Sequence, residues 1–185
     1  MLSNYNYEKL YPLYGFGALL NSNPYGEVSM LFNINFKDNP EIPTINNILN
    51  AYRACLDKLI FAGPAFFTPN IKTILERIRS KNNNLEYTIL LVLTDGVIDD
   101  METTIDALVE NSFLPFSVII VGIGEADFSK MVGNDIPLAS SDKVRWVRDL
   151  VQFIQNNKYK NDEKTLTFYI NKSSPTKKIL EEIPR

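Results

Sequence analysis

The longest apolar run of the chain lies near its middle, at residues 87–93, and is rich in leucine and β-branched side chains. Its length and its lack of polar alternation predict a strand that is buried on both faces, as in the centre of a parallel sheet. The run stops at Thr94-Asp95-Gly96, where we expect a turn that only glycine adopts at low cost. Asp95 would then lie at the carboxyl end of a strand, the place where ligands bind in open α/β sheets. A structural role for Asp95, in tightening the turn, is the alternative.

A second apolar run, residues 116–123, predicts another buried strand. Between the two runs, apolar residues recur at helical spacing: Met101, Ile105, Leu108 and Val109. Asp99 and Asp100 precede this predicted helix, where their negative charge suits the helix dipole. A strand, a helix and a second strand in this order are typical of a parallel α/β unit.

The N-terminal third predicts two strands, at residues 10–20 and 30–36. In the first, Gly15 and Gly17 indicate a close approach of the backbone or a bulge. In the second, apolar and polar residues alternate, which is typical of a strand with one exposed face. We expect both strands to lie in the sheet of an α/β fold.

Two helices should follow. Residues 45–59 repeat apolar side chains at helical spacing, and Cys55 lies on that apolar face, where a buried and unreactive thiol is expected. Thr68-Pro69 has the composition of a helix start, and the apolar pattern after it continues to Ile78.

The C-terminal part is less regular. Residues 143–146 predict a short strand and residues 149–155 one or two helical turns, before a polar stretch. We expect residues 1–157 to form one α/β domain, and residues 158–185 to form a polar linker and a helix that packs on or near it.

The amino-acid composition excludes several kinds of functional site. The 185 residues are 45% hydrophobic and 22% charged, include one cysteine and no histidine, and carry a net charge of −3. These counts exclude an internal disulfide, a histidine-based triad and a multi-cysteine zinc site, and they speak against nucleic-acid binding. No apolar run approaches the roughly 20 residues of a membrane span. We therefore expect a cytoplasmic chain that does not itself insert into a membrane.

Several segments together resemble the von Willebrand factor A-type domain of the copine family. The strings that carry the resemblance are residues 11–18, Leu93-Thr-Asp-Gly-Val-Ile98 and Ser117-Val-Ile-Ile-Val-Gly122. The resemblance implies a three-layer Rossmann-like sandwich with a mostly parallel central sheet. It also implies a non-catalytic domain that recruits a target protein, within a protein that binds membranes calcium-dependently through upstream C2 domains. The target itself is not implied.

Domains of this type hold a divalent cation at a metal-ion-dependent adhesion site. The Asp-x-Ser-x-Ser motif of that site is missing here, and Ala65 follows Gly-Pro where the family has threonine. Asp95 matches the family's third-loop aspartate, and Thr68 is a candidate substitute ligand. For such a degenerate site we expect weak binding of Mg²⁺ or Ca²⁺, or none, because Mg²⁺ needs several oxygen ligands in octahedral geometry. The expected partner-binding residues are Ala65, Thr94, Asp95, Gly96, Asp99 and Asp127.

By this resemblance the family's first strand is missing from the chain. It would lie between residues 10–20 and 86–94, and its loss would leave unpaired backbone edges there. Either the chain is a fragment of a longer product, or the pairing is restored by rearrangement or by another chain, which makes a homo-oligomer plausible. A competing hypothesis is a metal-assisted hydrolase that uses Asp95, Asp99 and Asp100. The lack of histidine and of a phosphate-binding loop counts against it.

Overall fold

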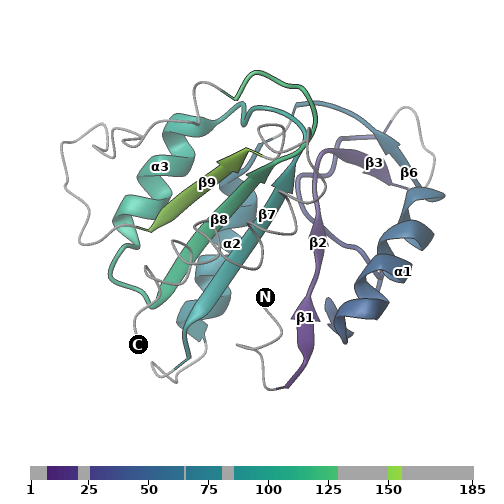
Figure 1. The fold of residues 1–185 in the computed structure, drawn as a ribbon, viewed down its shortest axis with the longest axis horizontal. Helices are drawn as coiled ribbons and strands as arrows, with labels where there is room; N and C mark the ends of the chain where they lie inside the picture. Colours follow the sequence, from purple (N-terminus) through teal and green to yellow (C-terminus); the bar gives the residue numbers. More distant parts are fainter. Residues whose placement is uncertain (1–7, 21–25, 65, 81–85, 129–149, 156–185) are drawn as a thin grey trace, which may run out of the picture. The chain divides into compact units, whose positions relative to one another are not determined.

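A computed structural model of the chain describes residues 8–20, 26–64, 66–80, 86–128 and 150–155 (Figure 1). The chain divides into two compact units, Met1–Asn70 and Ile71–Arg185. The predicted strand at residues 143–146 and the predicted linker and helix at residues 158–185 lie outside the described residues. The prediction of a single domain over residues 1–157 therefore stays a prediction.

The first unit contains three short antiparallel strand pairs. They are β1 (Leu10–Pro12) with β5 (Glu41–Pro43), β2 (Tyr14–Gly15) with β4 (Phe32–Asn33), and β3 (Ala18–Leu20) with β6 (Leu59–Phe61). The prediction of one strand over residues 10–20 is wrong, because this segment changes its partner twice along its length. The predicted strand at residues 30–36 likewise shrinks to β4.

The two glycines of this segment have the roles that the sequence predicts. A β-carbon on Gly15 would lie 2.4 Å from Cζ of Phe32, its partner in the β2–β4 pair. Gly17 has a φ of +71°, a left-handed conformation that other residues rarely adopt. Gly15 thus permits a close approach of two strands, and Gly17 permits the turn between β2 and β3.

Helix α1 (Ile45–Leu56) closes the core of the first unit, which is built from Ala18, Phe32, Ile34 and Cys55. The helix ends three residues earlier than predicted, and Leu59 begins β6 instead. Only one side of α1 meets the core: Cys55 is 1% exposed, whereas Leu49 and Tyr52 are 51% and 47% exposed. The predicted burial of Cys55 is confirmed, but the helix carries more apolar surface than its unit covers.

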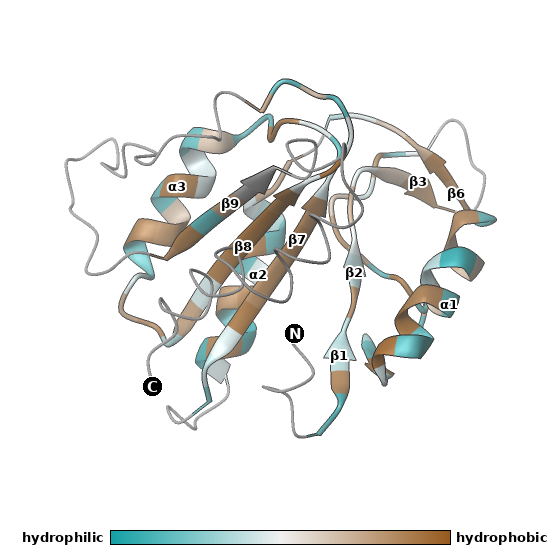
Figure 2. Cartoon of the chain, in the orientation of Figure 1, coloured by the Kyte–Doolittle hydropathy of each residue, from teal (hydrophilic) through white to brown (hydrophobic). Residues whose placement is uncertain are grey.

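The second unit is a mixed α/β structure around a parallel sheet. Its strands are β7 (Thr88–Thr94), β8 (Phe116–Gly122) and β9 (Val151–Gln155), in the order β7-β8-β9. Figure 2 shows that β7 and β8 are hydrophobic over most of their length. The predicted parallel α/β sheet is confirmed for these strands. The third strand was predicted to be helical and this is wrong, since β9 extends the sheet beside β8.

Two helices alternate with the strands of this sheet along the chain, one before β7 and one before β8. Helix α2 (Thr68–Ser80) begins in the first unit, at the threonine expected from sequence, and most of it belongs to the second. Helix α3 (Met101–Glu110) connects β7 to β8. Arg79 near the end of α2 donates a hydrogen bond to Oδ1 of Asn111, directly after α3, so the ends of the two helices lie together. Within the described parts of the chain, neither these helices nor α1 are long and apolar enough to cross a membrane.

Strand β7 is buried on one face only. Val92 and Thr94 are 5% and 8% exposed, but Leu91 and Leu93 on the opposite face are 40% and 56% exposed. The prediction of a strand buried on both faces is wrong, because the face that carries Leu91 and Leu93 is left largely uncovered. The expectation of an unpaired edge beside residues 86–94 concerns the whole chain and stays a prediction.

Candidate functional site

Strands β7 and β8 are parallel, so the loops that follow them emerge at the same edge of the sheet (Figure 1). One loop spans residues 95–100, and of the segment that follows β8 the structure describes residues 123–128. The Ile123 N–H donates a hydrogen bond of 2.8 Å to the Thr94 carbonyl, which ties the bases of the two loops together. We call these two loops, with Thr94, the carboxyl-end surface.

Thr94 shapes the first loop through its side chain. The buried hydroxyl donates to the Gly96 carbonyl at 2.9 Å and accepts from the Gly96 N–H at 3.3 Å. Gly96 itself is not left-handed, and a β-carbon there would meet no atom within 4 Å. The prediction that this turn depends on glycine is therefore wrong: the hydroxyl of Thr94 makes the turn, and other residues could adopt the conformation of Gly96.

A buried side chain anchors the first loop between its two exposed carboxylates. Ile98 is 5% exposed, whereas Asp95 and Asp99 on either side of it are exposed. Asp100 takes the N-cap position of α3 without capping through its side chain, and instead its Oδ1 accepts a hydrogen bond of 3.4 Å from the Thr104 hydroxyl. The loop is thus fixed at three points, Thr94, Ile98 and Asp100.

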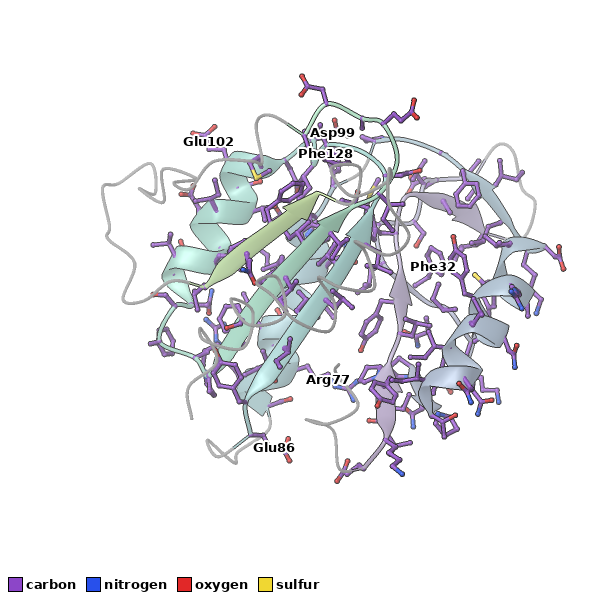
Figure 3. All side chains as sticks on the ribbon, in the orientation of Figure 1. Phe32, Arg77, Glu86, Asp99, Glu102 and Phe128 are labelled. Atoms are coloured by element: carbon purple, nitrogen blue, oxygen red, sulfur yellow. The ribbon has the colours of Figure 1, made fainter. Side chains whose placement is uncertain are left out.

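The second loop rests on an aromatic floor. Phe128 is 1% exposed and its ring lies 5.6 Å from that of Phe153 in β9. A β-carbon on Gly122 would lie 2.9 Å from Phe153 and 3.0 Å from Phe128. Both rings therefore need glycine at the end of β8. Figure 3 labels Phe128 and Asp99 at this end of the sheet. Sequence reasoning missed this floor, whose only local signal is one aromatic residue after a polar loop.

The carboxyl-end surface is acidic. The described parts of its two loops contain five acidic residues, Asp95, Asp99, Asp100, Glu125 and Asp127, and no lysine or arginine. All of them except Asp100 are exposed. Of the predicted partner-binding residues, Thr94 ends β7, Asp95, Gly96 and Asp99 come from the first loop, and Asp127 comes from the second. Ala65, the last of the predicted partner-binding residues, lies outside the described residues.

The donor set does not fit a protein-held magnesium ion. Among the residues that the structure describes, no three Asp, Glu, Cys or His side chains are grouped closely enough to hold a metal. The Thr94 hydroxyl is already bonded to Gly96. Thr68, the other candidate ligand, lies at the start of α2. Because the described residues contain no group of three such side chains, Asp95, Asp99 and Asp100 do not form the cluster that the hydrolase hypothesis requires.

Cys55, the remaining group with reactive chemistry, lies in the core of the first unit. Burial raises the pKa of its thiol, and the positive charge of Lys58 lowers it in part. A thiol with a raised pKa and almost no exposure is a poor nucleophile. This agrees with the structural role expected from the sequence.

Comparisons with known proteins point to one family. The profile of the Copine family matches residues 1–185. A protein of Caenorhabditis briggsae, named nicotinic receptor-associated protein 1, is 35% identical over 163 residues. The similarity covers 86% of this chain but 26% of that relative, so the chain corresponds to about a quarter of the relative's length.

Proposed function

This chain belongs to the copine family, and on that premise we propose that it is a non-catalytic interaction domain that recruits a target protein through its carboxyl-end surface. The observation that carries the proposal is the pair of anchored loops whose described residues include four exposed acidic residues and no basic residue. Loops on a rigid scaffold are common binding elements, because the scaffold limits the entropy lost on binding.

The charge of the surface suggests the chemistry of the target. Complementary charge steers association and rejects partners of the same sign. We propose a lysine- or arginine-rich segment as the target. The name of the Caenorhabditis briggsae relative makes segments of a nicotinic receptor reasonable first probes.

The remaining features of this proposal follow from the family. We propose a von Willebrand factor A-like three-layer sandwich over residues 1–157, in the cytoplasm, with calcium-dependent membrane binding supplied by other domains of a longer protein. A Mg²⁺ or Ca²⁺ ion at Asp95 would draw most of its ligands from water, because a lysine- or arginine-rich target supplies few oxygen ligands, so its contribution to binding would be small.

Charge-neutralised variants test the proposal. Two synthetic peptides of equal length, one with four lysines and one with four glutamates, are titrated against the chain and followed by fluorescence anisotropy. We expect the lysine peptide to bind more tightly, and the variant Asp95→Asn, Asp99→Asn, Asp127→Asn to lose about tenfold in affinity. This estimate takes about 0.5 kcal/mol for each exposed charge pair, and about 1.4 kcal/mol for a tenfold change.

A second triple variant controls for net charge. Glu27→Gln, Glu76→Gln and Glu110→Gln remove three exposed acids that lie outside both loops. Equal losses in the two triple variants, or a preference for the glutamate peptide, would show that the carboxyl-end surface is not the recognition site. Receptor segments are then tested against the same three proteins.

A further inference from the structure

The second loop of the carboxyl-end surface returns to the strand from which it starts. It leaves β8 after Gly122, and Phe128 folds back over the same glycine, since a β-carbon on Gly122 would lie 3.0 Å from the Phe128 ring. Gly124, with a φ of +91°, has a left-handed conformation that permits such a tight return. Residues 123–127 therefore form a short closed loop, and two of the exposed acidic residues of the surface lie within it.

A side chain from another strand fills the place where this loop closes. Phe153 of β9 stands opposite Ile120 of β8, and residues 120 and 122 of a strand lie on one face. The Phe153 ring extends to Gly122, where a β-carbon would lie 2.9 Å from it. It also lies 5.6 Å from the Phe128 ring, measured between the two centroids. One ring thus supports both ends of the closed loop.

We infer that Phe153 is a positioning residue for the acidic side chains of the second loop, so that β9 controls how this loop meets a basic target. The inference rests on the recruitment function proposed above and adds to it a residue from outside both loops. Asp127 directly precedes Phe128, so a movement of the Phe128 ring carries the Asp127 carboxylate with it. A loop that is already held in one conformation loses less entropy on binding. The first loop has anchors of its own on β7 and α3 and should keep its shape.

Nuclear magnetic resonance relaxation of the backbone nitrogens tests the positioning in the free chain. Phe153→Leu keeps an apolar side chain but removes the ring. We expect the order parameters of residues 123–128 to fall from roughly 0.85, the value of a rigid backbone, to below about 0.6, whereas residues 95–100 keep theirs. Phe116→Leu is the matched control, because it removes a ring that is 1% exposed at the opposite end of β8 and should leave both loops unchanged.

A double-mutant cycle with the lysine peptide separates positioning from general destabilisation. In wild type, Glu125→Gln with Asp127→Asn should cost about fivefold in affinity, from the same energy for each exposed charge pair as above. In Phe153→Leu the same two changes should cost less than about twofold, because the two carboxylates no longer hold their places. Asp95→Asn with Asp99→Asn should cost about fivefold in both backgrounds.

The two measurements distinguish failure of the inference from failure of the recruitment proposal. If wild type does not prefer the lysine peptide, the recruitment proposal is wrong, and the order parameters still decide whether Phe153 positions the loop. Unchanged order parameters in Phe153→Leu, or an equal cost of the second-loop changes in both backgrounds, would overturn the inference. Circular dichroism establishes that Phe153→Leu is folded. If it unfolds, Gly122→Ala takes its place in both measurements, since the added β-carbon displaces a ring.

Discussion

Replacing Gly15 with alanine should destabilise the first unit through a single steric contact. The new β-carbon would lie 2.4 Å and 2.6 Å from two ring carbons of Phe32 and 2.9 Å from Cδ1 of Ile34. Both side chains are core residues, 8% and 6% exposed. The Phe32 ring also stacks on Phe36, with centroids 6.2 Å apart, so it cannot swing away without losing that contact.

The size of the effect follows from two opposing terms. Overpacking a core costs about 1–3 kcal/mol, because side chains leave their rotamers and the backbone shifts. Replacing glycine with alanine reduces the freedom of the unfolded chain, which returns about 0.4–1 kcal/mol. We expect a net loss of about 1–2 kcal/mol in the free energy of unfolding. For a chain of this size the melting temperature would fall by about 2–8 °C.

Urea denaturation followed by far-ultraviolet circular dichroism measures this change. Gly96→Ala is the matched control and should be neutral or stabilising by up to about 1 kcal/mol, because its β-carbon meets no atom within 4 Å and the unfolded chain loses freedom. Combining Gly15→Ala with Phe32→Leu should cost less than the sum of the two single changes, since the shorter side chain vacates the contact. A Gly15→Ala protein as stable as wild type, or strictly additive effects, would refute the steric reasoning.

Three further predictions concern the carboxyl-end surface and the buried thiol. Thr94→Val removes both hydroxyl bonds to Gly96 and should cost about 1–3 kcal/mol in unfolding free energy and weaken peptide binding, whereas Thr94→Ser should retain both. Cys55 should resist alkylation until the protein is unfolded. Because burial raises the pKa of this thiol, the folded state favours its protonated form. The contribution of the buried thiol to the free energy of unfolding is complete below the ordinary thiol pKa of about 8.5, and it declines as pH rises through the pKa of the folded state. Wild type should therefore lose stability relative to Cys55→Ala in alkaline titrations. Finally, thermal melts in EDTA and in excess Mg²⁺, Ca²⁺ or Mn²⁺ should coincide, because a bound ion would raise the midpoint; a rise that Asp95→Ala abolishes would instead reveal a working cation site.

Local patterns predicted much of the secondary structure. The apolar runs at residues 87–93 and 116–123 predicted the two strands that became β7 and β8, and the helical spacing between them predicted α3. The close backbone approach at Gly15 and the burial of Cys55 were also predicted from the sequence. The residue type, as for glycine, or the apolar side of an element indicates these features, and both are visible in the order of residues.

Features that depend on a distant neighbour came only from the tertiary structure. An apolar run has the same composition whether one face of its strand is covered or both, so the exposure of Leu93 became visible only with the tertiary structure. Likewise, residues 151–155 became a strand because β8 offers them a hydrogen-bonding edge. The carboxylates of the candidate site are recognisable in the sequence, but whether they converge depends on loop conformation. Sequence by itself determined which surfaces are apolar or acidic, and the tertiary structure decided what each surface faces, because packing partners lie far apart along the chain.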